Sequence, residues 1–107
     1  MKNIKFSKVY SKTDINRLRR NSKNKDEPTY LIFGSPWSQP SSYIYSKINV
    51  EENEDPGIQV GWVDLFENPE IFDLFKIKHV PSCIKIENGE FSETLEYNQL
   101  LYNELGL

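Results

Sequence analysis

The chain has 107 residues, a formal net charge of −3 at pH 7, one cysteine and one histidine. This length suits one domain with a single hydrophobic core, which we expect to span residues 1–107. A single cysteine excludes an intramolecular disulfide scaffold. With one histidine beside it, too few ligands remain for a structural zinc site, so we expect neither a metal nor a cofactor.

Targeting signals are missing from the sequence. No apolar run approaches the roughly 20 residues of a membrane-spanning helix, and Met1–Lys5 lacks the apolar region of a signal peptide. We therefore expect a cytoplasmic protein with no membrane partner. The absence of alanine, together with ten asparagines and ten isoleucines, points to an AT-rich genome such as that of a phage or a low-GC bacterium.

Strand and helix patterns alternate along the chain. Residues 4–9 alternate between apolar and polar side chains, whereas residues 30–34 are continuously apolar, as expected for a strand covered on both faces. Asn88-Gly89 is the strongest hairpin signal. The expected strands are 4–9, 30–34, 58–65, 83–87 and 91–95. The expected helices are 14–24, 38–49 capped by Ser38, one that starts at Asn68-Pro69, and 98–105.

The stretch Thr29–Ser42 organises the rest of the chain. Its apolar strand turns and then reads Trp-Ser-Gln-Pro-Ser at residues 37–41, at the start of the second helix. Ser38 stands where an N-cap belongs, so we expect its hydroxyl to accept a hydrogen bond from the backbone N–H of Ser41. Pro40 falls in the first turn of the helix, where a missing N–H costs nothing.

This arrangement resembles the active site of the thioredoxin superfamily, whose pattern is Trp-Cys-x-Pro-Cys. Both cysteine positions hold serine in this chain. Val-Asp-Leu-Phe-Glu-Asn-Pro-Glu-Ile at residues 63–71 is similar to the family's Val-Asp-Val-Asp-Glu-Asn-Pro-Glu-Leu. Ile-Lys-His-Val-Pro-Ser at 77–82 resembles Ile-Arg-x-Val-Pro-Thr, and Glu-Asn-Gly-Glu at 87–90 resembles Lys-Asn-Gly-Glu. The resemblance extends from about Lys5 to the C-terminus.

The resemblance implies an α/β structure, the thioredoxin fold, with a central mixed five-stranded sheet flanked by helices on both faces in the order βαβαβαββα. It also implies a cis peptide bond between Val80 and Pro81, facing the active site, and an exposed Trp37. Ser38 and Ser41 take the positions of the attacking and resolving cysteines. The residues that would contact an extended peptide of a protein partner in the adjoining groove are Trp37, Gln39, Pro40, Val80 and Pro81.

Disulfide exchange is not open to the chain as written, because the reaction needs a thiolate and a second sulfur. A serine nucleophile would need a base within reach, and we expect His79, the single histidine, to be a surface residue. Cys83 is expected to be a packed core thiol. Ile32 stands where the family has a buried, proton-moving aspartate. A weaker alternative is stabilisation of a bound thiolate by serine, as in the glutathione transferases that share this fold.

Two interpretations of function follow. If the serines are native, the protein is a redox-inactive module that binds a protein partner through the groove. If they replace cysteines, the parent is a thiol–disulfide oxidoreductase of the thioredoxin or glutaredoxin type.

Charge adds a third interpretation. Residues 1–26 hold nine basic and two acidic residues, and the remainder holds four basic and fourteen acidic ones. Such an asymmetry could steer an acidic partner or a nucleic acid to the basic segment. A solvated helix face remains the simpler explanation. The residues concerned are Arg17, Arg19, Arg20 and Lys23.

Overall fold

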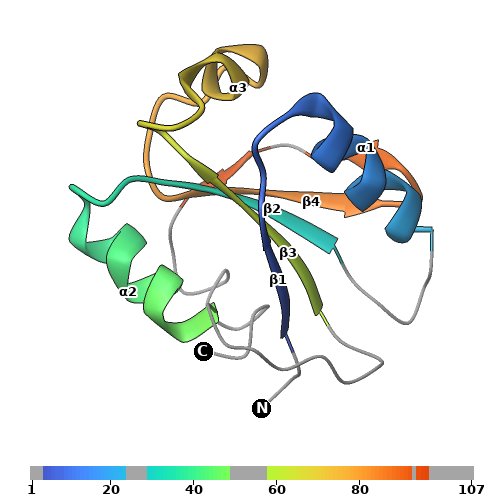
Figure 1. Cartoon of the computed structure of the whole chain (residues 1–107), viewed down its shortest axis with the longest axis horizontal. Helices are drawn as coiled ribbons and strands as arrows, with labels where there is room; N and C mark the ends of the chain where they lie inside the picture. The colour runs from blue at the N-terminus through green and yellow to red at the C-terminus, as the bar shows by residue number, and fades with distance from the viewer. Residues whose placement is uncertain (1–3, 24–28, 49–57, 93, 97–107) are drawn as a thin grey trace.

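The computed structural model describes residues 4–23, 29–48, 58–92 and 94–96. Within them a sheet separates helices α1 (Lys12–Asn21) and α3 (Pro69–Leu74) on one face from α2 (Gln39–Ile48) on the other (Figure 1). No helix in this part of the chain is both long and apolar enough to cross a bilayer. The expected helix at 98–105 lies outside the described residues.

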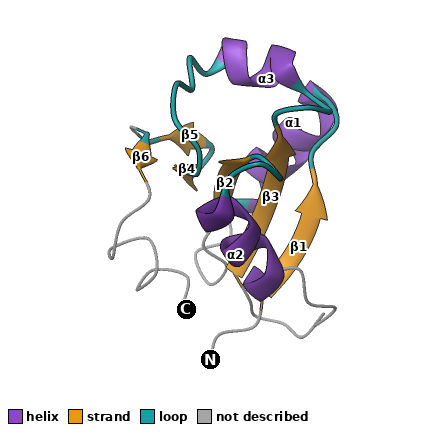
Figure 2. Cartoon of the chain, turned by 90° about the vertical axis from the view of Figure 1, so that its left-hand side faces the viewer, coloured by secondary structure: helices purple, strands orange, loops and turns teal. Residues whose placement is uncertain are grey.

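The sheet has the mixed topology that the resemblance implied. Strands β1, β3 and β2 run parallel to one another, and β4 is antiparallel to β2. Figure 2 shows the order β1-β3-β2-β4, with β5 and β6 both paired to β4 at the far edge. The strands are β1 (Ile4–Lys8), β2 (Thr29–Gly34), β3 (Ile58–Asp64), β4 (Ser82–Glu87), β5 (Glu90–Phe91) and β6 (Leu95–Glu96).

The far edge corrects one sequence prediction, because the single strand expected at 91–95 is divided in two. Ile86 pairs with Phe91, but Cys83 pairs with Leu95, so the edge segment uses one residue more than β4 over the same length. One extra residue on one strand is a β-bulge, which interrupts the ladder. The five predicted strands are therefore present, the fifth as two short segments.

The core lies on both faces of β2, every residue of which is buried. On the α2 face, Ile32 and Trp62 pack against Ile44 of the helix. On the opposite face, Leu31 and Phe33 pack against side chains of α1 and α3. A strand covered on both sides explains the continuous apolar run of this segment.

Helix boundaries differ slightly from the prediction. Helix α1 starts and ends earlier than the expected 14–24, and Asp14 accepts a 2.8 Å hydrogen bond from the N–H of Tyr10 just before it. Asn68 does precede α3, with Pro69 at the first helical position. The Asn68 side chain makes no capping hydrogen bond. Instead, its amide donates to the carbonyl of Val9 at 2.9 Å and so ties the end of β1 to the start of α3.

Candidate functional site

A tight turn carries the chain from β2 into α2. The N–H of Ser38 donates to the carbonyl of Ser35 at 3.1 Å, and the buried hydroxyl of Ser35 accepts from the N–H of Trp37 at 3.2 Å. Pro36 occupies the second turn position, for which its fixed φ is suited. The turn leaves Trp37 at the rim of the molecule with 81% of its surface exposed, as the resemblance predicted.

Ser38 is the N-cap that the sequence predicts. Its hydroxyl accepts from the N–H of Ser41 at 3.3 Å, and its carbonyl accepts from the N–H of Ser42 at 3.0 Å. Because the side chain already serves one of the free N–H groups at the helix start, the oxygen has a structural task. Gln39 and Pro40 lie exposed on the first turn.

Ser41 has a different environment, although it belongs to the same motif. It is 0% exposed, and its hydroxyl has no hydrogen-bond partner among the described residues. A side chain at Gly34 would lie 2.4 Å from the Trp62 indole and 3.3 Å from the Ser41 Cβ, so glycine allows helix, strand and indole to approach one another closely. Ile32, also 0% exposed, adds to the apolar surroundings on this face.

Pro81 lies next to this turn because of the sheet register. Phe33 pairs with Ser82, so the residue before Ser82 stands beside the end of β2. The Val80–Pro81 peptide bond is cis, in agreement with the resemblance. Val80 is half-buried and Pro81 is buried. That these residues contact a partner remains a prediction.

Phe66 is a neighbour of the motif that the sequence analysis did not identify. The Asp64 carboxylate accepts hydrogen bonds from the N–H groups of Phe66 at 2.8 Å and Glu67 at 3.3 Å, which forms a turn after β3. The rings of Trp37 and Phe66 lie 5.8 Å apart between centroids, and Phe66 is 59% exposed. We call this exposed pair, Trp37 and Phe66, the aromatic rim.

One backbone contact joins the two halves of the aromatic rim. The N–H of Leu65 donates to the carbonyl of Gly34 at 3.0 Å, so the turn that carries Trp37 and the turn that carries Phe66 are held together. A sequence signal for Phe66 did exist. In the segment Val-Asp-Leu-Phe, phenylalanine stands where the matching thioredoxin pattern has a second aspartate.

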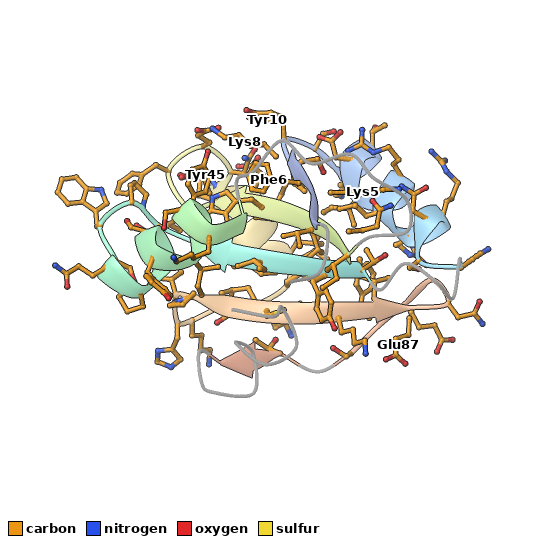
Figure 3. The ribbon with its side chains drawn as sticks, turned by 90° about the horizontal axis from the view of Figure 1, so that it is seen from below. Lys5, Phe6, Lys8, Tyr10, Tyr45 and Glu87 are labelled. Carbon is orange, nitrogen blue, oxygen red and sulfur yellow. The ribbon has the colours of Figure 1, made fainter. Side chains whose placement is uncertain are left out.

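A small cleft opens beside the motif turn, between the ends of β1 and β3 and the start of α2. Its volume is about 160 Å³, and Tyr45, Trp62 and Pro36 provide aromatic and apolar walls. Figure 3 shows Lys8 gathered with Phe6, Tyr10 and Tyr45 at this end of β1. The pKa of Lys8 is raised above its ordinary value, mainly by the negative charge that Tyr45 acquires when it ionises, with smaller contributions from Tyr10, Glu67 and Asp64 against a lowering by burial.

The remaining candidates from the sequence do not join the motif. His79 is exposed, and Cys83 is 0% exposed in the core, as predicted. Among the described residues, no group of three or more His, Cys, Asp or Glu side chains is placed to hold a metal ion. Arg17, Arg19, Arg20 and Lys23 lie exposed on or just after α1, on the other face of the sheet from α2.

Comparisons with known proteins support the fold. No protein-family model and no curated protein sequence matches the chain. Among solved structures, a thioredoxin from Fasciola hepatica is similar with a TM-score of 0.72 and 19% identity, over 91% of this chain and 92% of that one. A mutant thioredoxin from Halobacterium salinarum has a TM-score of 0.71 and 19% identity, over 94% of this chain and 88% of that one. A thioredoxin from Trypanosoma brucei brucei has a TM-score of 0.61 and 23% identity, over 85% of this chain and 77% of that one. The chain therefore has the thioredoxin fold.

Proposed function

We propose that this thioredoxin-fold domain is a protein-binding module and performs no disulfide exchange with the residues it carries. The observation behind the proposal is the contrast within the motif. Trp37 and Phe66 form an exposed aromatic rim, whereas the two positions that would need sulfur hold serine.

The chemistry of serine excludes disulfide exchange at the motif. A helix N-terminus lowers the pKa of a cysteine enough to form a thiolate near neutral pH, but a serine hydroxyl in the same place stays protonated. The Ser38 oxygen is moreover engaged as the cap of α2. Cys83 is fully buried and cannot meet a substrate in its place. Recognition through the aromatic rim is the capacity that remains.

The partner we expect is an extended peptide segment of another protein. Such a segment can pair with exposed backbone in the manner of an added strand, and side-chain pockets next to it give specificity. Aromatic residues near the centre of an interface commonly contribute most of the affinity. Trp37 and Phe66 are aromatic and exposed, and turns anchored to the ends of β2 and β3 position both rings.

The first test uses peptides selected from a random display library on the unmodified protein and then titrated by fluorescence anisotropy. We expect Trp37→Ala to weaken binding about thirtyfold, the effect of losing roughly 2 kcal/mol at an interface anchor. Phe66→Ala should weaken it in the same direction, and neither change should shift the thermal midpoint appreciably because both side chains are exposed.

Leu74→Ala is the matched control, because Leu74 is an apolar side chain of similar exposure, 52%, that does not belong to the aromatic rim. It should leave peptide affinity unchanged. Equal losses in the Leu74 and Trp37 variants would contradict the proposal, as would peptides that bind unchanged to Trp37→Ala. Charge reversal at Arg17, Arg19 and Arg20 should likewise have little effect on these peptides.

One observation favours a second candidate function, a thiol–disulfide oxidoreductase whose two cysteines are replaced by serine. The Ser41 hydroxyl is buried among apolar side chains and has no hydrogen-bond partner within the part of the chain that the structure describes. A thiol is a weak donor that behaves as a small hydrophobe, so sulfur would suit this position better than oxygen. The capped N-terminus of α2 would also stabilise a thiolate at position 38.

Restored cysteines test the second candidate. Under the second candidate, Ser38→Cys combined with Ser41→Cys should reduce a disulfide substrate such as insulin in the presence of dithiothreitol. The unmodified chain should show background activity. Without dithiothreitol, Ser38→Cys with Ser41 intact should stop at a mixed disulfide, because the motif supplies no second sulfur to resolve it. A double variant without turnover would contradict the second candidate.

Turnover by the unmodified protein would contradict the first candidate and make Cys83 the working thiol. Reading codons 38 and 41 in the source gene separates an original pair of serines from a substituted one.

A further inference from the structure

A second cleft, of about 290 Å³, lies on the face of the sheet opposite α2 and is thus separate from the aromatic rim. It forms where the outer side of α1 meets the turn between β4 and β5. Three cationic side chains, one amide and one glycine line it. We call it the basic cleft, and its residues are Asn16, Arg19, Arg20, Lys23 and Gly89.

Arg19 is held in place by two contacts with the hairpin. Its Nε donates to the carbonyl of Gly89 at 3.0 Å, and its guanidinium carbon lies 5.2 Å from the centroid of the Phe91 ring. A guanidinium fixed in this way loses less conformational entropy when it binds an anion than a freely rotating side chain does.

The hairpin turn itself is docked on the end of α1. The hydroxyl of Ser22 accepts from the N–H of Gly89 at 2.8 Å, and the carbonyl of Ser22 accepts from the N–H of Asn88 at 3.4 Å. Gly89 has a φ of 82°, in the region that favours glycine, and it presents no side chain to the cleft. The wall of the basic cleft opposite α1 is therefore backbone at a fixed position.

The cations of the basic cleft form no ion pair with the described parts of the fold. Arg17, one turn earlier and outside the cleft, faces Asp14 at 3.9 Å, whereas no described carboxylate pairs with Arg20 or Lys23.

Helix capping does not occupy these side chains either. The carbonyls of Leu18 and Arg20 accept from the backbone N–H groups of Ser22 and Lys23, at 2.9 and 3.2 Å, and the carbonyl of Arg19 accepts from the Ser22 hydroxyl at 2.6 Å. Backbone groups and one serine thus satisfy these three carbonyls at the end of α1, and within the described residues no contact occupies the charged groups of Arg20 and Lys23.

We propose that the basic cleft binds a phosphate monoester. Such a group carries a charge of about −1.5 to −2 at pH 7 and three strong acceptor oxygens, which suits converging guanidinium and ammonium donors. Glu87 and Glu90 are backbone partners across the turn that contains Gly89, and Lys85 neutralises one of these two charges through a 3.0 Å ion pair with Glu87. The remaining negative charge at this turn disfavours a longer polyanion. A compact anion fits, and a nucleic-acid strand running over the hairpin would meet like charge.

The test is a titration of the full chain, followed by NMR chemical shifts of backbone amides. The probes are glycerol 3-phosphate, a short peptide with one phosphoserine, the same peptide without phosphate, and a single-stranded oligonucleotide. We expect both phosphate monoesters to shift amides around Gly89 and Lys23, and the unphosphorylated peptide to shift none. Similar affinities for the two monoesters mean that the phosphate alone is recognised, and a tenfold preference for the peptide identifies a protein as its source.

Variants that neutralise basic residues inside and outside the cleft localise the site. Arg20→Gln with Lys23→Gln should weaken monoester binding at least tenfold, and Arg17→Gln, on the same helix but outside the cleft, should stay within twofold of the unmodified protein. Both residues of the double variant are exposed, so folding should be preserved. Binding should also strengthen between pH 5 and pH 7.5, since the second phosphate ionisation lies near pH 6.

Three results would overturn the proposal. One is the absence of monoester binding at millimolar concentration. Another is an equal loss of binding in the Arg17 variant and in the cleft variant, which would mean general attraction by surface charge. The third is oligonucleotide binding without monoester binding, which would make the basic face a nucleic-acid surface instead.

Discussion

Serines 38 and 41 show how strongly surroundings decide the role of a residue type. Both belong to the first turn region of α2, yet the Ser38 oxygen accepts a backbone hydrogen bond and the Ser41 oxygen has no described partner. A buried hydroxyl without a partner costs about 1–3 kcal/mol of desolvation. The same atom type is therefore stabilising at one position and destabilising three residues later.

This difference predicts stability changes of opposite sign. Ser41→Ala should raise the free energy of unfolding by about 1 kcal/mol, because the orphan hydroxyl is removed and little volume is lost. Ser38→Ala should lower it by about 1 kcal/mol, through loss of the cap. Urea unfolding followed by circular dichroism measures both. Destabilisation in both variants would mean that the Ser41 oxygen has a partner in solution.

The role of Ser38 was predictable from the local sequence, whereas the contact of Phe66 with Trp37 depends on tertiary structure. An N-cap depends on residues within four positions of one another, so the pattern Ser-Gln-Pro-Ser was sufficient. Phe66 reaches Trp37 only because β2 and β3 are neighbours in the sheet, a contact between segments 29 residues apart that no local pattern encodes. The orphan state of Ser41 is likewise a property of the packed core.

At the level of elements, one buried side chain contributes two hydrogen bonds at the junction between α1 and the hairpin, beside the contacts of Arg19 and of the Ser22 carbonyl. The Ser22 hydroxyl donates to the carbonyl of Arg19 at 2.6 Å and accepts from the N–H of Gly89 at 2.8 Å, and Ser22 is buried. A single oxygen thus fastens the end of the helix to a turn that lies 67 residues further along the chain.

Ser22→Ala should therefore destabilise the fold by about 1–3 kcal/mol, since it leaves the buried N–H of Gly89 unsatisfied. Ser46→Ala is the matched control, because the Ser46 hydroxyl bonds only a local carbonyl, that of Tyr43, at an exposed site. Chemical denaturation should show little change for the control, and amide hydrogen exchange at Gly89 should quicken in the Ser22 variant alone. Equal effects in both variants would refute this account of the junction.

The hairpin was predictable as a turn that joins two strands, but the division of its second strand was not. Asn88 and Gly89 have φ of 50° and 82°, the positive values that a two-residue turn of this kind requires and that Asn-Gly supplies at low cost. The bulge beyond it depends on how the edge segment meets β4, and nothing in residues 91–95 marks the extra residue. Turn chemistry is local, whereas register is a property of two strands.

For the molecule as a whole, the order of strands and helices followed from alternating patterns together with the spaced motifs. The central place of β2 was predicted from its continuous apolar run, and complete burial confirms it. The distribution of charge was also visible in the sequence. What the sequence could not show is that three of the basic residues line one cleft with a glycine from a distant turn.

Alkaline stability provides a test at this scale, because Lys8 connects β1 with α2 and with the turn after β3. Its pKa is raised in the folded state, chiefly by ionised Tyr45, so the fold favours the charged lysine. The part of this stabilisation that comes from Glu67 and Asp64 is present at neutral pH, whereas the part from Tyr45 requires an ionised phenol, which tyrosines form only at about pH 10. Both parts are lost as pH rises through the raised folded-state pKa of Lys8.

The stability difference between the unmodified protein and Lys8→Gln should accordingly stay constant up to about pH 9 and be lost at the alkaline end, where Lys8 is deprotonated. Lys8 is partly solvated, so screening should keep the difference below about 1 kcal/mol. Urea titrations at a series of pH values measure it, with Lys47→Gln as the control. A difference that persists undiminished where Lys8 is deprotonated would have the wrong sign for a raised lysine pKa.

The two edges of the sheet affect the tendency of the protein to aggregate at high concentration. An open strand edge is a template for pairing between molecules, and natural proteins limit this with short edge strands, lysines and bulges. Here β1 at one border has five residues, including Lys5 and Lys8, and the opposite border is broken by the bulge between β5 and β6. Both borders are therefore poor templates for aggregation, so the chain can expose the two rings of the aromatic rim and still resist self-association through its sheet.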